Sequence, residues 1–523
     1  MFTFKLHEST PTAEPGLLPP RALPDVSSFW RPAFPGIERR IPPASNLNFA
    51  VKLLRLGWVL FLLPLHLALV LGHHLSPAPS VVPPPGWVPG VTRQWTVGQR
   101  VLYPVAGRLV WALTGIGHLV DYGAWLEREV PPFTRVLMWL LSLGRIRMEV
   151  ELIELSDVAR AEEWVRGEAA DPMGVVRPER VAGFWVNGQR DKAADRLKAA
   201  GLGVAKRRVA GGRVVLYLAG KCSWFPTAGV CTSGADSYSS TLSFETLAGG
   251  GYCAGHPAEF GRAFAITRDA PVPYLHINCR KATHPDKAFP GVLLDALAGY
   301  AHLVQLGYDE IVVGGDSSGA AVAISLTLYL ANTLAQSSHP PPSLILPVAV
   351  LACSPWADLT LSTSTNPSIT DCNDDILTPA MLATASNHYL SHLSALDPQV
   401  RAAQPATSPA RLLATHPFFS PALPTSLPAL QQLSRAYSGE RPLRWLVFCG
   451  TAELFADEAR ALVFGLEQAA LAGGAVPGKA HAMEVEAAEY VDEVHCGYLI
   501  FPRFVSPAAG EFWARVDRFV GGA

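Results

Sequence analysis

The residues that most clearly predict chemistry lie in one short stretch, 310–321, which contains the pattern Gly315-x-Ser317-x-Gly319. A β-branched run at 311–313 precedes this pattern and predicts a buried strand, and an apolar, helix-like run follows it. Small residues on both sides of a serine permit the tight strand-to-helix turn that presents a hydroxyl above a sheet. We therefore predict that Ser317 is a catalytic nucleophile rather than an ordinary turn serine.

A catalytic serine needs a base to take its proton and an acid to orient that base. For a serine on a turn of this kind, the chain order is serine, then acid, then histidine. His495 follows a strand-like run near the end of the chain and is the best candidate for the base. The segment that follows the apolar run 444–449 contains three acidic residues, Glu453, Asp457 and Glu458. Asp457 has an alternative role as the N-terminal cap of a helix.

The composition limits the possible partners. The chain has 523 residues, of which 49% are hydrophobic, so it can bury a large core, and its net charge of −2 gives no reason to expect a nucleic-acid partner. Its 8 cysteines include no Cys-x-x-Cys pair, and we expect no disulfide framework. Cys222, Cys231, Cys253 and His256 do not match the spacing of a standard zinc site, so we expect no bound metal.

From about residue 149 onward, the sequence alternates between strand-like and helix-like runs. The strand-like runs are 182–186, 213–218, 272–278, 311–313, 346–352 and 443–449. This alternation predicts a mostly parallel sheet with helices on both faces. We therefore place one α/β domain over 149–523, and we expect residues 101–200 and about 359–440 to contribute a lid over the substrate pockets.

The part of the chain before this domain has a different character. Residues 1–50 are rich in proline and lack hydrophobic periodicity, so we expect a mostly disordered tail. Residues 51–75 include an uncharged apolar run at 56–71, which we interpret as a membrane anchor; an interfacial helix and a buried core helix are the alternatives. Lys52 and Arg55 precede this run, a bias that would leave the N-terminus in the cytosol.

Residues 76–148 form a further region, which begins with a Pro-rich linker. Two apolar stretches follow, at 109–120 and 136–143. The second stretch ends in Arg145-Ile-Arg147, a basic amphipathic pattern that suits a membrane surface. Helices that cover a hydrophobic cleft are an equal alternative for this region.

Several segments besides the serine motif resemble one family, the α/β-hydrolase fold-3 group, also called the hormone-sensitive-lipase-like carboxylesterases. The matching segments are 248–252, which is similar to the family's His-Gly-Gly-Gly oxyanion loop, 280–296, 354–358 and 420–421. The resemblance runs over about 210–520. It implies an α/β-hydrolase fold with a helical cap, and carboxylesterase activity that requires no cofactor.

The resemblance also implies a role for individual residues. Ser317 would be the nucleophile and His495 the general base. The acid falls on Glu453, where many relatives have an aspartate, and Asp457 is the fallback for this role.

The oxyanion donors follow from the same resemblance. They would be the backbone N–H groups of Gly250, Gly251 and Ser318, which stabilise the charge that develops on a substrate carbonyl. Ala248 stands where the family has a histidine, and this difference affects the rigidity of the loop but not its backbone donors.

The N-terminal apolar segment is similar to that of fungal steryl acetyl hydrolases of the endoplasmic reticulum, which are members of this family. The similarity implies a membrane-bound enzyme that hydrolyses short acyl esters of a lipophilic alcohol, such as sterol acetates. One alternative is a non-catalytic binding protein on the same fold, as in the gibberellin receptors, which lack the catalytic histidine. Another is an amidase or peptidase, because the triad does not distinguish between acyl leaving groups.

Residues 220–248 interrupt an otherwise continuous motif. Leu-Ala-Gly occurs at both edges of this segment, and joining Ala219 to Gly249 restores Val-Val-Leu-Tyr-Leu-Ala-Gly-Gly-Gly-Tyr. The segment is 29 residues long, so its removal preserves the reading frame. We interpret it as an extraneous insertion that arose from a retained intron; a genuine surface insertion or a loop that gates the pocket is the rival interpretation.

Overall fold

The structure is a computed structural model that describes part of the chain before residue 270 and most of it afterward. The described residues are 5–7, 57–58, 61–64, 67–68, 99–103, 148–155, 164–165, 176–186, 212–218, 251–252, 270 and 272–522, the last range with gaps at 283–284, 337–340, 361–374, 378–381, 383–384, 387, 391–415, 438–440, 473–481 and 501–504. The predicted insertion at 220–248 lies outside the described residues.

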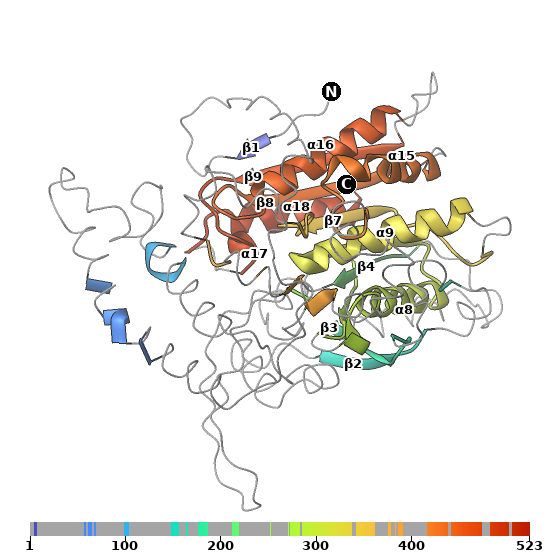
Figure 1. The fold of residues 1–523 in the computed structure, drawn as a ribbon, viewed down its shortest axis with the longest axis horizontal. Coiled ribbons are helices and arrows are strands. Elements are labelled where there is room, and N and C mark those ends of the chain that lie inside the picture. Colours follow the sequence, from blue (N-terminus) through green and yellow to red (C-terminus); the bar gives the residue numbers. More distant parts are fainter. Residues whose placement is uncertain are drawn as a thin grey trace, which may run out of the picture.

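Nine strands among the described residues form one sheet in the order β1-β9-β8-β7-β6-β4-β5-β3-β2 (Figure 1). The strands are β1 (Lys5–His7), β2 (Met148–Ile153), β3 (Val181–Val186), β4 (Arg213–Leu218), β5 (Tyr274–Asn278), β6 (Glu310–Asp316), β7 (Ala349–Cys353), β8 (Leu443–Gly450) and β9 (Met483–Tyr490). The pairs from β5 through β4, β6, β7, β8 and β9 to β1 are parallel, whereas β2 and β3 are antiparallel to their neighbours. The predicted mostly parallel sheet is confirmed.

Helices cover both faces of this sheet. They are α8 (Gly291–Gln305), α9 (Ser318–Gln336), α15 (Leu427–Ala436), α16 (Ala456–Ala472), α17 (Gly497–Ile500) and α18 (Ala509–Gly521). Gly299 of α8 lies against the side chain of Leu216 on β4. Residue pairing across β6 and β7 places Leu216 and Trp445 of β8 on the same face of the sheet, so α8 covers that face. Phe448 is three residues beyond Trp445 on β8, so its side chain points to the opposite face, where it packs against Phe512 of α18.

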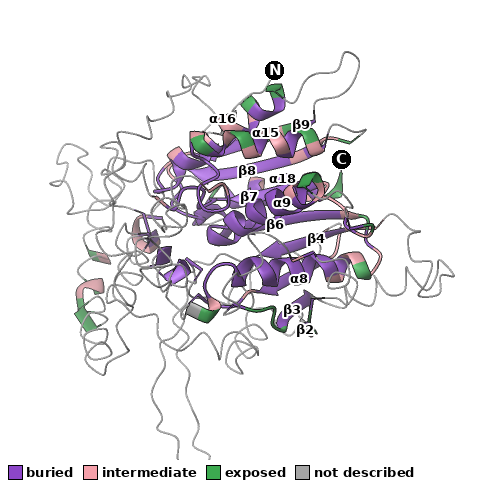
Figure 2. Cartoon of the chain, turned by 45° about the vertical axis from the view of Figure 1, so that its right-hand side comes forward, coloured by how far each residue is buried: buried purple, intermediate pink, exposed green. Residues whose placement is uncertain are grey.

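The core consists of the central strands and the helix that follows β6, both drawn as buried in Figure 2. Ile311, Val312 and Val313 of β6 are almost entirely buried, as expected for a parallel strand that is covered on both faces. Among the described residues, α9 is the one helix long and apolar enough to cross a membrane, and most of it is buried in this core. Its apolar composition is therefore explained by packing within the α/β fold.

The N-terminal region differs in one respect from the prediction. We expected a disordered tail over 1–50, but residues 5–7 form the edge strand β1, which pairs in parallel with β9. The physical reason is that the edge of β9 presents unpaired backbone N–H and C=O groups, which an extended segment can pair with whatever its composition. Of the predicted anchor at 51–75, only eight residues are described, all of them helical.

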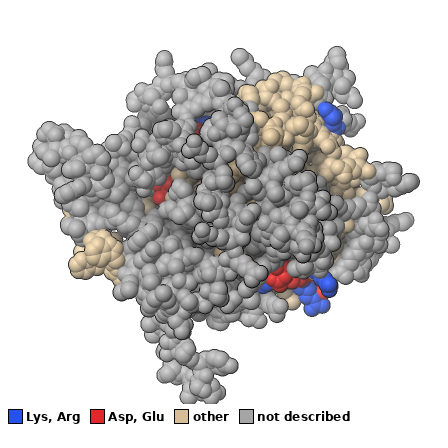
Figure 3. All heavy atoms as spheres, viewed as in Figure 1, with Lys and Arg blue, Asp and Glu red and all other residues tan. Residues whose placement is uncertain are grey.

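The described surface is mixed in charge. On the face drawn in Figure 3, the described Lys, Arg, Asp and Glu side chains lie in small, separate groups, and no broad basic patch forms among them. Two aromatic side chains of the 51–75 segment stand out from this surface, since Trp58 is 57% exposed and Phe61 is 72% exposed.

Candidate active site

Ser317 occupies the turn between β6 and α9, as the sequence predicted. Its φ angle is +55°, in a region that costs a non-glycine residue about 1–3 kcal/mol and that clusters at active sites. Its backbone N–H donates to the carbonyl of Cys353 at 2.8 Å, which ties the turn to the end of β7. A Cβ at Gly315 would lie 2.3 Å from the carbonyl oxygen of Leu218, so only glycine fits at that position of the motif.

The register of the sheet brings the other candidate residues to the same edge. The last residue of β6, Asp316, pairs with Cys353 of β7, and Gly450 of β8 pairs with Tyr490 of β9. The carboxyl ends of these parallel strands therefore lie side by side, which is where ligands bind in open α/β sheets. Residues in the turns that follow β6, β7, β8 and β9 can therefore meet at the carboxyl end of the sheet, and Ser317 is one of them.

Glu453 and His495 lie close together at this edge, in the turns that follow β8 and β9. Oε2 of Glu453 is 3.6 Å from Nδ1 of His495, and both side chains are fully buried. This separation is longer than a hydrogen bond, although catalytic contacts are often longer before substrate binds. The ring of His495 also packs edge-on against Phe455, with the centroids 4.9 Å apart.

The second nitrogen of His495 does not contact the serine directly. Its Nε2 lies 3.7 Å from Sγ of Cys496, and the described residues include no hydrogen bond between His495 and Ser317. Asp457, the fallback acid, instead forms an ion pair with Arg460 at 2.7 Å in the first turn of α16. Of the two candidate acids, Glu453 is the one that the fold brings to His495.

Ser354, which follows β7, connects the acid to the turn that carries the base. Its hydroxyl donates to Oε2 of Glu453 at 2.6 Å and accepts from the N–H of Cys496 at 3.2 Å. It also lies 2.8 Å from the hydroxyl of Tyr498. The sequence marked the segment that starts at Ser354 only as a family landmark, and nothing in the pattern indicated this set of contacts.

Burial controls the protonation of the buried pair. It raises the pKa of the Glu453 carboxyl, and the Ser354 hydroxyl opposes this effect by hydrogen bonding to the charged form. Burial also lowers the pKa of His495, and the nearby charges of Asp375 and Asp316 oppose that effect. His495 is therefore neutral at pH 7, the state in which an imidazole can accept a proton.

The described part of the oxyanion loop lies against the start of α9. The N–H of Tyr252 donates to Oγ of Ser318 at 3.3 Å, and Gly251 has a φ angle of +37°. A Cβ at Gly251 would lie 2.8 Å from Cβ of Ala385, so the loop has no room for a side chain there. Gly251 and Ser318 are therefore neighbours, while Gly250 lies outside the described residues.

Packed aromatic side chains connect the oxyanion loop to the histidine. Tyr252 stacks on Tyr389 with the ring centroids 3.8 Å apart, and it also packs against Trp356 at 5.5 Å. Trp356 stacks in turn on Phe455, the residue that packs against His495. An apolar surrounding of this kind excludes water and favours an apolar ligand.

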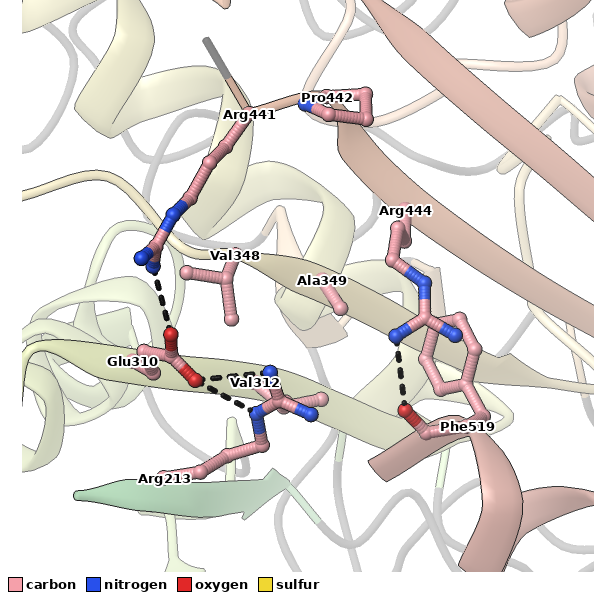
Figure 4. A pocket seen from close by; sticks show the side chains of 9 residues that line it. All are labelled: Arg213, Glu310, Val312, Val348, Ala349, Arg441, Pro442, Arg444 and Phe519. Carbon is pink, nitrogen blue, oxygen red and sulfur yellow. Dashed lines mark hydrogen bonds and ion pairs between the residues drawn. The ribbon is translucent and has the colours of Figure 1, made fainter. Parts of the chain in front are cut away.

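A hollow of about 230 Å³ lies at the opposite edge of the sheet, where the parallel strands begin (Figure 4). Arg213, the first residue of β4, and Arg441 both form ion pairs with Glu310, the first residue of β6. Arg213 and Arg444 donate to the carbonyls of Val520 and Phe519 at the end of α18. These arginines fasten the last helix to the sheet, and the hollow is remote from Ser317.

The described residues offer no alternative chemistry based on metals or disulfides. No group of His, Cys, Asp and Glu side chains within the described part has the arrangement of a metal site. The cysteines that the structure describes form no disulfide; they are Cys279, Cys353, Cys449 and Cys496. The other candidate ligands, Cys222, Cys231, Cys253 and His256, lie outside the described residues.

Comparisons with known proteins agree with the fold. Residues 246–496 match the family model of the alpha/beta hydrolase fold, a range that holds the serine, the acid and the histidine. Over these residues the chain has the α/β-hydrolase fold. A comparison with curated proteins finds no match.

Solved structures with similar folds include several esterases. An esterase from the bacterial hormone-sensitive lipase family is 16% identical with a TM-score of 0.41, and the match covers 88% of this chain and 97% of that one. Carboxyl esterase 2 from the mycorrhizal fungus Tuber melanosporum is 13% identical with a TM-score of 0.42, and the match covers 76% and 99% of the two chains. Similarity at this level carries no argument about the chemistry of this chain.

Proposed function

We propose that the chain is a carboxylic ester hydrolase that cleaves short acyl esters of a lipophilic alcohol through Ser317, His495 and Glu453; the match to the alpha/beta hydrolase fold supports the proposal. The observation that carries the proposal is the convergence of these residues at one sheet edge: a strained serine on the turn after β6, and a buried histidine 3.6 Å from a buried carboxylate. A serine, an acid and a histidine in this chain order form the triad of α/β-hydrolases.

In the proposed reaction, Oγ of Ser317 attacks the ester carbonyl while His495 takes the serine proton. The imidazolium that forms is stabilised by the carboxylate of Glu453 through Nδ1. Backbone N–H groups of Gly250, Gly251 and Ser318 stabilise the oxyanion. Collapse of the tetrahedral intermediate releases the alcohol with the proton from His495, and water then cleaves the acyl-serine bond by the same route.

The environment of the site supports an apolar substrate. Tyr252 of the oxyanion loop packs against Trp356 and Tyr389. Tyr389 comes from the segment that we expected to form a lid. Gly251 fits tightly against Ala385, so little room is left near the carbonyl of the proposed ester substrate. This favours a substrate with a short acyl group. A lipophilic alcohol, such as that of a sterol acetate, would then account for the aromatic lining.

We also propose that the protein is bound to a membrane, in the endoplasmic reticulum, through residues 51–75. The exposed, stacked side chains of Trp58 and Phe61 in this segment support the proposal, because aromatic residues are favoured at membrane interfaces. A membrane location would give the enzyme direct access to lipophilic esters dissolved in the bilayer.

The test is a substrate screen with the purified full-length protein in detergent. We expect hydrolysis of p-nitrophenyl acetate and of a sterol acetate, a steep loss of rate with longer acyl chains, and no activity in Ser317→Ala. Equal turnover of a matched anilide would show an amidase instead. Binding of esters without turnover would show a non-catalytic binding protein and would refute the proposal.

A further inference from the structure

A buried carboxylate outside the proposed triad joins its acid and its base. Asp375 lies between β7 and α15, in the stretch that we expected to form a lid, and its side chain is buried. Its Oδ2 accepts the N–H of Leu454 at 2.8 Å, and its Oδ1 accepts the N–H of His495 at 3.0 Å. Leu454 directly follows Glu453 in the chain. One side chain therefore holds the backbone at both members of the pair.

The two turns that this carboxylate joins belong to different strands. Glu453 follows β8 and His495 follows β9, so the distance between their side chains depends on how the two turns are held together. Ala452 also donates to the carbonyl of Glu493 at 3.0 Å, which joins the turns nearer to the sheet. Asp375 joins the same two turns at His495 and next to Glu453, the residues that are proposed to carry out the chemistry.

We propose that Asp375 is a positioning residue for the ester hydrolysis, which sets the separation of Glu453 and His495 and favours the protonated form of His495 with its negative charge. This inference rests on the proposed function. The carboxylate touches backbone N–H groups of the triad turns, so it acts through Glu453 and His495 rather than on the substrate itself.

The charges around His495 support the second part of this inference. The imidazole contacts Glu453 from the β8 turn and the thiol of Cys496, and the charges of Asp375 and of Asp316 from the end of β6 also act on it. Burial lowers the pKa of His495, and among the charges that oppose this effect Asp375 is the strongest and Asp316 the next.

Asp375 is itself charged at the pH where the enzyme is expected to work. Burial raises the pKa of this carboxyl to about 6, and the charge of His495 and the N–H groups of Leu454 and His495 oppose the rise. Above that pH, the carboxylate accepts both N–H groups in its charged form.

The test replaces the carboxylate by a neutral side chain in Asp375→Asn. An amide can accept one of the two N–H groups but not both, and it carries no charge. We expect kcat to fall about 10- to 100-fold, as for other groups that orient a catalytic side chain, with little change in KM. The loss of kcat should be larger at pH 8 than at pH 5, because burial raises the pKa of Asp375 to about 6 and its carboxyl is charged only above that pH.

Two further variants separate positioning from stability. Asp375→Glu keeps the charge, so we expect a smaller loss of kcat at pH 8 than in Asp375→Asn. Asp295→Asn is the matched control, because Asp295 is a buried carboxylate that pairs with Arg280 at 2.5 Å. This control should lower the thermal midpoint without a loss of kcat that grows between pH 5 and pH 8.

The NMR signal of the His495 Nδ1 proton at pH 8 gives a readout that does not depend on turnover, because it reports the contact with Glu453. A changed Nδ1–H signal in Asp375→Asn, with no such change in Asp295→Asn, supports the inference even if the esters tested prove not to be substrates. An unchanged Nδ1–H signal in Asp375→Asn overturns it. If that variant does not fold, an unchanged Nδ1–H signal together with an unchanged kcat in Asp375→Glu, whose longer side chain displaces the carboxylate, overturns it as well.

Discussion

At the residue scale, the hydroxyl of Ser354 forms the hydrogen bond that most directly orients the proposed acid. It donates to the same Glu453 oxygen that faces His495, and it accepts from the N–H of Cys496, the residue after the histidine. A carboxylate that a hydroxyl already holds in place loses less conformational freedom when the imidazolium forms. Preorganisation of this kind is a large part of enzymatic rate enhancement.

We predict that Ser354→Ala lowers kcat about 10- to 100-fold, which corresponds to the 1.5–3 kcal/mol typical of a hydrogen bond to a charged group. Steady-state kinetics with p-nitrophenyl acetate measure this effect. Ser434→Ala is the matched control, because the hydroxyl of Ser434 is buried in α15 and has no hydrogen-bond partner among the described residues. Equal activity in the two variants would show that Ser354 does not orient the acid.

The choice between the two acids gives a second prediction at this scale. We expect Glu453→Gln to lose about 10²- to 10⁴-fold in kcat, by analogy with other triad acids. Asp457→Asn removes only a partly exposed ion pair with Arg460, and such pairs contribute about 0–1 kcal/mol to stability. Kinetics of both variants decide the matter, and a greater loss in Asp457→Asn would show that the acid is assigned to the wrong residue.

At the scale of elements, one helical turn from the N-terminal region supports the segment that carries the base. The hydroxyl of Tyr103 donates to Oε2 of Glu493 at 2.5 Å, and Gln99 donates to the other carboxylate oxygen at 3.3 Å. Glu493 lies two residues before His495, and Ser506 also donates to it at 2.8 Å. At this point, the region before the α/β domain is therefore hydrogen-bonded to the turn that carries the proposed base.

We predict that Tyr103→Phe lowers the free energy of unfolding by about 1–3 kcal/mol, because a buried carboxylate loses a donor. Burial already raises the pKa of Glu493 to about 7, and the Tyr103 hydrogen bond opposes that rise. The loss should therefore be larger at pH 8, where the carboxylate is charged, than at pH 5.5. Urea denaturation at both pH values measures it.

Tyr490→Phe is the control for this measurement, since the Tyr490 hydroxyl is buried without a hydrogen-bond partner among the described residues. Its unfolding free energy should change little at either pH. A Tyr103→Phe effect that is no greater at pH 8 than at pH 5.5 would contradict the role of the carboxylate charge.

The strand–turn–helix at Ser317 could be predicted from the sequence because its rule is local: small residues flank a serine between a β-branched run and an apolar helix. The contacts of Ser354 and Asp375 could not be predicted in this way. They depend on the register of β7, β8 and β9, which brings together residues about 80–140 positions apart. Strand β1 was missed because an edge strand can pair with almost any extended segment.

At the scale of the whole molecule, the fold separates two ends with different roles. Ser317, Glu453 and His495 follow the carboxyl ends of the parallel strands. The arginines that hold α18 lie at the opposite end of these strands (Figure 4). The helical residues described in the 51–75 segment precede the turn that contains Tyr103. A deletion that ends before residue 99 would therefore leave the support of Glu493 in place.

We predict that removal of residues 1–75 releases the protein from membranes and retains its esterase activity. Carbonate extraction of membrane fractions compares the two forms, and we expect only the full-length protein to stay in the pellet. If full-length protein washes into the supernatant, residues 51–75 are not an integral anchor. If the shortened protein resists extraction, the membrane contact lies in residues 76–148.

In the proposed reaction, Ser317 forms an acyl-enzyme during ester hydrolysis. This intermediate can be trapped by rapid mixing of the purified protein with p-nitrophenyl acetate, followed by acid quenching and peptide mass spectrometry. We predict a burst of one p-nitrophenolate per active site and one acetyl group on the peptide that holds Ser317, with both lost in Ser317→Ala. Full hydrolysis by Ser317→Ala, or an acetyl group on another residue in its place, would show that Ser317 is not the nucleophile.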